Sequence, residues 1–130
     1  MAVRLTILIK KVESISDEDF HIYWSKSHPR IFLSVKIVQE KVVKYNQFHV
    51  NRDVMNALAS HGLPAAEYDG GVNLWANSVE DLMAVFQDDE YNRVVVPDEN
   101  SFLQRHEAKM MVGYDEDKWV DGKVVPDIGV

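Results

Sequence analysis

The apolar positions of the N-terminal half follow a two-residue repeat, then a helical repeat, then a two-residue repeat again. Val3–Lys10 alternates between an aliphatic and a more polar face, which predicts a strand. Ser16 precedes three acids and then apolar residues spaced three and four apart, which predicts a capped helix. Pro29 disfavours helical geometry at His28, so we expect a break or kink there before a second helical stretch. Alternation returns over Val42–Val50 and predicts the second strand.

The C-terminal half predicts shorter elements. They are a short helix over Arg52–His61, a strand over Val72–Ala76, a helix over Val79–Gln87 and a strand over Lys109–Tyr114. Between the last two, residues 88–96 show no clear period, and Pro97 can open a further turn that carries Phe102 inward. After Asp115 the chain is charged and has no usable period. We therefore expect one domain over residues 1–115 and a tail over residues 116–130 that is mobile or packs on a partner subunit.

The order strand, long helix, strand, strand, helix, strand is that of the split βαβ, or ferredoxin-like, α+β fold. This fold has a four-stranded antiparallel sheet with its helices on one face. We expect the other face to carry one of two sets: Tyr45, Gln47 and His49, or Val3, Leu5, Ile7 and Ile9. Either set is costly to leave open, so we expect two sheets to pair in a homodimeric α+β barrel with a cavity in or beside each sheet.

Composition narrows the possible partners. A formal net charge of -7 is the wrong sign for binding phosphate backbones, so we expect no nucleic-acid partner. The chain has no cysteine, which excludes disulfides, thiolate nucleophiles and cysteine-ligated clusters. No apolar run approaches the roughly 20 residues that span a bilayer, and the N-terminus does not have the pattern of a signal peptide. We expect a cytoplasmic protein without a membrane partner.

Five ordered segments carry a family resemblance. They are Ser16-Asp17-Glu18-Asp19-Phe20 with Tyr23-Trp24, His28-Pro29, Tyr45-Asn46-Gln47-Phe48-His49, Asp69-Gly70-Gly71 ahead of Trp75, and Val96-Pro97-Asp98-Glu99 with Phe102. Together they resemble the EthD-domain family of dimeric α+β barrels, and more closely its small fungal members in aromatic polyketide pathways. The resemblance spans about residues 3–114.

The resemblance implies a cofactor-free enzyme acting on a polycyclic phenolic polyketide. The fungal members are described as decarboxylases of anthrone-type acids such as atrochrysone carboxylic acid, and others as dehydratases. We expect a decarboxylase first and a dehydratase second. Two other activities stay open: a cofactor-independent monooxygenase or cyclase, and a non-catalytic barrel that shields a reactive polyketide.

Three residues are the candidates for catalysis. Loss of carbon dioxide or of water needs a proton donor or acceptor beside a developing enolate, and histidine suits either role near neutral pH. His28 matches the family's histidine position, although it could also cap the helix. His49 shares a strand face with Tyr45, so the two could enter one cavity. We expect His28 and His49 to be acid and base and Tyr45 to position a substrate oxygen.

Further residues are candidates for substrate binding, each with a structural alternative. They are Tyr23, Trp24, Gln47, Asp98, Phe102 and His106. The aromatic residues could simply belong to the core, Asp98 could cap a helix, and His106 could lie in solvent. His21 and His61 are expected at the surface. The histidine and acid spacings match no common metal-ligand pattern, and no phosphate loop or dinucleotide motif is present, so we expect no metal and no cofactor.

Overall fold

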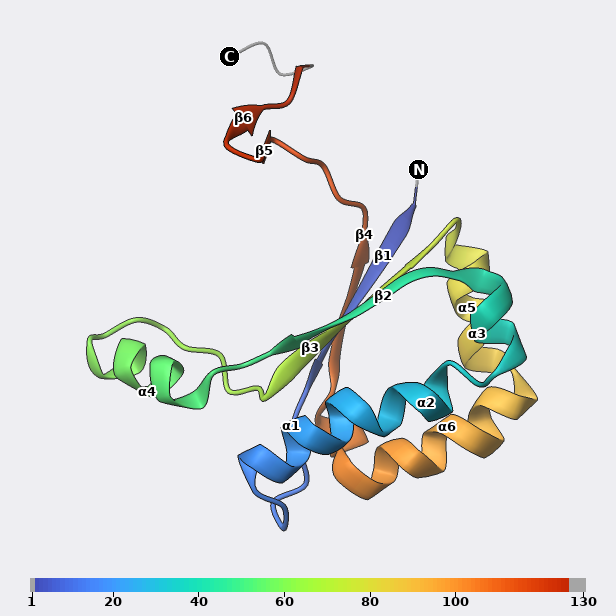
Figure 1. Ribbon diagram of the computed structural model, residues 1–130, viewed down its shortest axis with the longest axis horizontal. Coiled ribbons are helices and arrows are strands. Elements are labelled where there is room, and N and C mark those ends of the chain that lie inside the picture. The colour runs from blue at the N-terminus through green and yellow to red at the C-terminus, as the bar shows by residue number, and fades with distance from the viewer. Residues whose placement is uncertain (1, 127–130) are drawn as a thin grey trace.

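The computed structural model describes residues 2–126, which form an antiparallel sheet covered on one side by helices (Figure 1). The four strands are β1 (Val3–Ile9), β2 (Val42–His49), β3 (Gly70–Ala76) and β4 (Lys109–Gly113). Their order across the sheet is β2-β3-β1-β4, with every neighbouring pair antiparallel. This is the predicted ferredoxin-like α+β arrangement.

The helices pack as one layer against the sheet, apart from α4 (Figure 1). They are α1 (Asp17–Lys26), α2 (His28–Phe32), α3 (Lys36–Lys41), α4 (Arg52–Ser60), α5 (Val79–Gln87) and α6 (Asp89–Phe102), followed by the 3-10 turn η1 (Arg105–Glu107). Helices α2 and α6 lie side by side, and α4 projects from the far end of β2. The layer between helices and sheet is where a cavity can form.

Local sequence signals explain most helix boundaries. The Ser16 side chain accepts a hydrogen bond from the backbone N–H of Asp19, as the capping pattern predicted. The break expected near His28 falls at Ser27, between α1 and α2. The second helical stretch is itself divided, because α2 ends at Phe32 and α3 begins at Lys36.

Helix α6 is longer than the sequence indicated. Asp88 caps it through the N–H of Tyr91, and the helix continues through Pro97 instead of starting there. An internal proline removes one helical hydrogen bond and normally disfavours the arrangement. Here the loss is offset by burial of Tyr91, Val95 and Phe102 along the same helix. The ambiguous residues 88–96 are therefore helical, and Asp98 and Glu99 lie inside a helix.

Two apolar clusters hold the helices on the sheet. The larger one joins Leu5 and Leu74 of the sheet to residues of α2, α5 and α6, and the smaller one centres on Phe20, Trp24 and Phe102. Gly70 is needed beside the smaller cluster, since a Cβ there would lie 2.5 Å from the Trp24 ring. The indole consequently packs directly against the β3 backbone.

The prediction of the uncovered sheet face was wrong. The strand register places Leu5, Tyr45 and Leu74 side by side, and all three pack in the core under the helices. The open face carries the alternate residues of the four strands, which are Arg4, Thr6, Leu8, Lys44, Asn46, Phe48, Gly71, Asn73, Trp75, Lys109, Met111 and Gly113. Both predicted sets belong to the helix-covered side, because the alternate set includes the charged residues Arg4, Lys44 and Lys109, which are costly to bury.

The tail contains a small hairpin that the sequence did not indicate. Strands β5 (Trp119–Val120) and β6 (Lys123–Val124) pair through a turn with positive φ at Asp121 and Gly122. Residues 127–130 of the predicted tail lie outside the described residues. Within residues 2–126, no helix has the length and apolarity needed to cross a membrane.

Candidate active site

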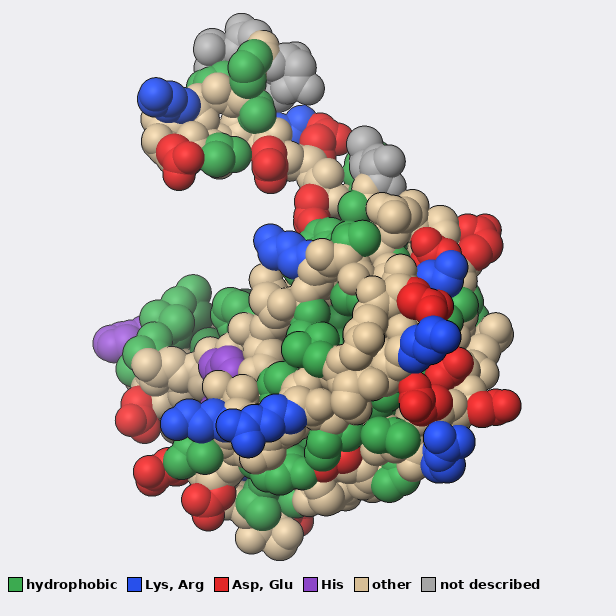
Figure 2. Space-filling model, turned by 45° about the vertical axis from the view of Figure 1, so that its right-hand side comes forward, with side chains coloured by type: hydrophobic (Ala, Val, Ile, Leu, Met, Phe, Trp, Pro, Cys, Tyr) green, Lys and Arg blue, Asp and Glu red, His purple; other side chains and the backbone are tan. Residues whose placement is uncertain are grey.

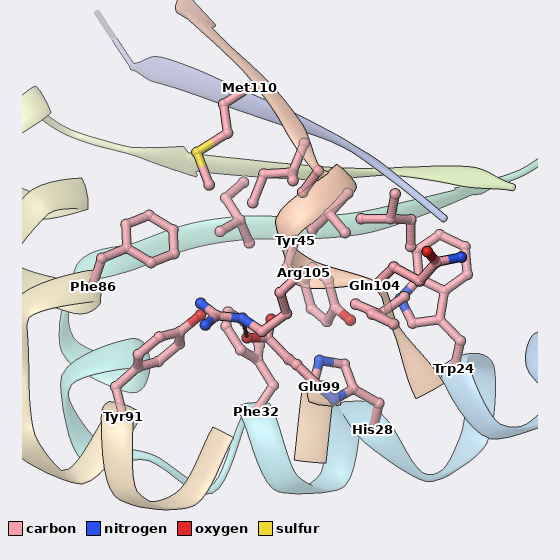
Figure 3. A pocket seen from close by; sticks show the side chains of 16 residues that line it. Trp24, His28, Phe32, Tyr45, Phe86, Tyr91, Glu99, Gln104, Arg105 and Met110 are labelled. Carbon is pink, nitrogen blue, oxygen red and sulfur yellow. Dashed lines mark ion pairs between the residues drawn. The ribbon is translucent and has the colours of Figure 1, made fainter. Parts of the chain in front are cut away.

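A cavity of about 90 Å³ lies between the sheet and the helix layer (Figure 3). Aliphatic residues of β1 and β3 form one wall, and aromatic residues of four helices form the others. Its polar lining comes from His28, Tyr45, Glu99, Gln104 and Arg105. Figure 3 shows His28, Tyr45, Glu99 and Arg105 pointing into the same space from three different parts of the chain. The cavity thus combines mostly apolar walls with a few convergent acid-base groups.

Asp98 is the group that fixes His28. Its Oδ2 lies 2.6 Å from Nδ1 of His28, and its Oδ1 accepts a hydrogen bond from the Tyr23 hydroxyl. A carboxylate only accepts hydrogen bonds, so Nδ1 of His28 is the protonated nitrogen. The other ring nitrogen, Nε2, then has a free lone pair. Asp98 and Tyr23 therefore orient the imidazole and do not themselves line the cavity.

The environment of His28 favours the neutral base. The residue is buried, and desolvation lowers the pKa of His28 below its ordinary value of 6.5. The neighbouring Asp98 opposes this but is the smaller influence. Phe102 packs against the imidazole with ring centres 5.0 Å apart. At neutral pH the side chain is consequently an uncharged, oriented proton acceptor.

Glu99 is a largely buried acid that reaches the cavity from α6, the helix beside the α2 of His28. Burial raises its pKa to about 7, against an opposing effect of Arg105. The Arg105 Nε lies 3.2 Å from Oε1 of Glu99, yet the N–H is not directed at that oxygen. Oε1 is the buried side-chain oxygen without a hydrogen-bond partner among residues 2–126. A protonated Glu99 could therefore donate to a ligand oxygen in the cavity.

Tyr45 and Tyr91 supply hydroxyl groups to the same space. Burial raises the pKa of each phenol above its ordinary value, so both stay protonated. The Gln47 Nε2 donates to the Tyr45 hydroxyl oxygen at 2.8 Å and to the Trp24 carbonyl at 2.7 Å. Because the Tyr45 oxygen accepts from Gln47, its own proton remains available to a ligand. Gln47 is therefore a positioning residue for Tyr45.

The structure does not bring His49 and His28 into one site. His49 is exposed at the end of β2, where its Nδ1 lies 2.6 Å from Nδ1 of His21 and its Nε2 lies 2.8 Å from Oε1 of Gln47. The Trp24 ring packs against it and also lines the cavity, so the indole separates His49 from that space. His49 reaches Tyr45 only through Gln47.

The other predicted binding residues divide into three groups. Trp24 lines the cavity directly. Phe102 is buried behind His28, and Tyr23 and Asp98 support the imidazole from outside. His106 is exposed on η1 beside Glu107 and is not part of the cavity lining.

Sequence reasoning missed four polar residues of the site, namely Tyr91, Glu99, Gln104 and Arg105. Glu99 belongs to a segment already singled out, but nothing along the chain indicated that it is buried. The sequence did not predict that a helix runs through Pro97. That helix turns its inward positions toward the core and the cavity, and these positions are Tyr91, Val95, Glu99 and Phe102. In residues 2–126 there is no cluster of three or more His, Asp or Glu side chains suited to a metal.

Comparison with known proteins places these features in a family. Residues 13–106 match the EthD domain. The chain is 27% identical over 128 residues to the dehydratase aurZ of Gibberella zeae, covering 95% of this chain and 84% of that protein. It is 27% identical over 126 residues to the conidial pigment biosynthesis dehydratase EthD of Metarhizium robertsii, covering 94% and 88%.

Solved structures share the fold at low sequence identity. An ethyl tert-butyl ether d (EthD) family protein of Bacillus halodurans superposes with a TM-score of 0.60 at 14% identity, over 89% of this chain and all of that one. A dimeric protein with a ferredoxin-like fold from Bacteroides fragilis gives 0.58 at 9% identity, over 88% and 96%. These similarities support the ferredoxin-like fold itself.

Proposed function

This chain belongs to the EthD-domain family, and we propose that it is a cofactor-independent lyase that dehydrates a hydroxylated aromatic polyketide. The observation that carries the proposal is one cavity lined both by His28, which Asp98 orients, and by Glu99, whose pKa burial raises to about 7. The two relatives named dehydratases support the reaction type. The aromatic residues that line the cavity support an aromatic substrate.

Dehydration of a β-hydroxy ketone fits the two groups in complementary roles. Nε2 of His28 takes the proton from the carbon beside the ketone, and the Tyr45 and Tyr91 hydroxyls stabilise the enolate oxygen. The electron pair then forms the carbon-carbon double bond as the carbon-oxygen bond breaks. Glu99 protonates the leaving hydroxyl, which departs as water. The resulting imidazolium and carboxylate regain their starting states by exchanging a proton with solvent.

Decarboxylation remains the second candidate because of Arg105. Once Glu99 is protonated, the guanidinium beside it is available to bind the carboxylate of an anthrone-type acid such as atrochrysone carboxylic acid. The carbon-carbon bond would then break to release carbon dioxide, and the carbanion would take a proton from Glu99. The same residues thus serve both reactions, and the substrate decides between them.

A homodimer is part of the proposal. The open sheet face exposes Phe48 and Met111 by more than half of their surface, and the Bacteroides fragilis neighbour is described as dimeric. Pairing two such faces would remove this apolar surface from water. No nucleic acid or membrane takes part in the proposed reaction.

The test is incubation of the purified chain, without added cofactor, with a freshly generated anthrone-type β-hydroxy ketone acid. Product masses are followed against a protein-free control. Accelerated loss of water supports the dehydratase, and accelerated loss of carbon dioxide instead replaces it with the decarboxylase. Oxygen uptake would identify a monooxygenase, while retention of unchanged substrate would identify a binding barrel and overturn the lyase.

A further inference from the structure

Two parts of the chain project on the open side of the sheet, helix α4 and the β5–β6 hairpin, and they do so from opposite ends of the strands (Figure 1). The tail leaves the sheet after Gly113, which pairs with Arg4 at one end of β1. Helix α4 follows His49, which pairs with Gly70 at the other end of β3. Figure 2 shows the hollow that results between the two projections.

The hairpin has no partner within the described part of its own chain. Every hydrogen bond and ion pair of residues 116–126 in the described structure stays inside that segment. Trp119 is nevertheless 65% exposed and Val120 45% exposed, both on strand β5 of the formed hairpin. An ordered hairpin that presents a tryptophan to solvent is suited to contact another surface.

A largely apolar groove runs along the open face, from α4 to Arg4 near the other end of β1. Its apolar side chains are Leu8, Phe48, Val50, Met55, Ala66, Tyr68 and Met111, and Arg4, Thr6 and Asn73 add polar groups. Its volume is about 390 Å³, which leaves room for an aromatic side chain. Phe48 and Met111 are 64% and 62% exposed there, so the groove is open to a partner.

Charge distinguishes this face from the tail. The strand residues of the open face include three cations, Arg4, Lys44 and Lys109, and no acid. If no acidic residues lay between them, two such faces brought together would place like charges side by side. Residues 115–126 contain four acids and two lysines. Asp115 already contacts this face, 3.1 Å from the Arg4 guanidinium and 2.6 Å from the Trp75 indole nitrogen.

We propose that the β5–β6 hairpin docks on a second copy of this chain, with Trp119 in the apolar groove beside that copy's α4. Consider a two-fold dimer whose axis lies between the two open faces and runs perpendicular to the strands. The end of one sheet from which the tail leaves then faces the α4 end of the other sheet. Each hairpin then covers the groove of its partner, and the acidic tails lie between the basic faces. This inference rests on the proposed homodimer and specifies what completes its interface.

Cross-linking tests the contact directly, because the chain contains no cysteine. Two single variants are prepared, Val120→Cys on the hairpin and Ala66→Cys in the groove, with tags of different mass. Mixed and oxidised, they should form a covalent heterodimer several-fold faster than Val120→Cys mixed with Val79→Cys, which lies on the helix side. Equal rates would overturn the docking contact. A double variant Val120→Cys/Ala66→Cys that closes within one chain, without covalent dimers, would show that the hairpin covers its own sheet.

Sedimentation equilibrium separates failure of this inference from failure of the dimer. Removal of residues 116–130, or Trp119→Ser, should raise the dimer dissociation constant at least about tenfold. Ile22→Ser, on exposed surface of α1, should leave it unchanged. A wild-type chain that is dimeric and insensitive to both changes overturns hairpin docking alone. A wild-type chain that stays monomeric at micromolar concentration overturns the proposed homodimer together with it.

Discussion

The helix-covered face and the open face of the sheet are built from alternate residues of the same strands, but polar groups near the two faces differ in their exposure to water. Under the helices, His28 and Glu99 lose water, and their pKa values shift in opposite directions, that of His28 to below 6.5 and that of Glu99 from 4.5 up to about 7. On the open face, Arg4 and Lys44 keep much of their solvent and instead stack near the Trp75 ring. The comparison teaches that burial, more than residue type, sets acid-base behaviour in this fold.

The same contrast separates the two histidines that the sequence ranked together. His28 is buried and held by a carboxylate, whereas His49 is exposed and held by His21 and Gln47. Burial lowers the pKa of both, but only His28 borders the cavity. The two residues therefore give the sharpest test of the site.

The largest expected effect is loss of turnover in His28→Gln. Removing the proton acceptor should lower kcat by roughly 10²-fold or more, while His49→Gln should change it less than about threefold. Initial rates of the two purified variants provide the comparison, with circular dichroism and Tm as the check on folding. Equal losses in both folded variants would contradict the assignment of His28 as the sole histidine acting on substrate.

Glu99→Gln should lower turnover by roughly 10²-fold and change its pH dependence. Wild-type kcat/KM requires neutral His28 and protonated Glu99, so it should peak between the lowered pKa of His28 and about 7 and fall at higher pH. The residual activity of the variant should stay level from neutral to alkaline pH, because the titrating acid is gone. If kcat/KM of Glu99→Gln still decreased at alkaline pH, a group other than Glu99 would be responsible for that decrease.

The same substitution should change stability in a pH-dependent way. Since folding raises the Glu99 pKa from 4.5 to about 7, the folded state holds the proton more tightly, and stability falls as pH rises through this window. The free energy of unfolding of Glu99→Gln, relative to that of wild type, should therefore rise by roughly 3 kcal/mol from acid to alkaline pH. Urea unfolding of both proteins below pH 4.5 and above about pH 7 measures this difference. A difference that does not vary with pH would mean that Glu99 ionises normally.

The smallest expected effect is at Gln47. Gln47→Leu removes the amide that holds the Tyr45 hydroxyl, so kcat should fall by about fivefold with little change in KM. Gln39→Leu is the matched control, because Gln39 bonds only a backbone carbonyl on the exposed side of α3. Steady-state kinetics separate the two constants. A rise in KM alone would indicate that Gln47 binds substrate and does not orient Tyr45.

Local signals determined much of the fold. The alternation in β1 and β2, the serine caps of α1 and α5 and the break before Pro29 are short-range effects, and each lies within two residues of its predicted place. The order of these elements was enough to predict the ferredoxin-like sheet. His28, Trp24 and Tyr45, which the sequence predicted as site residues, also line the cavity.

Only the tertiary structure decided which residues share the cavity. Alternation divides a strand into two faces but does not say which face the helices cover. In the folded chain Leu5, Tyr45 and Leu74 pack under the helices, while the alternate residues stay on the open face. The helix through Pro97 required packing of Tyr91 and Phe102 to offset a lost hydrogen bond, so Glu99 could not be placed from local propensity. Its raised pKa follows from desolvation by residues distant in sequence, and such contacts exist only in the folded chain.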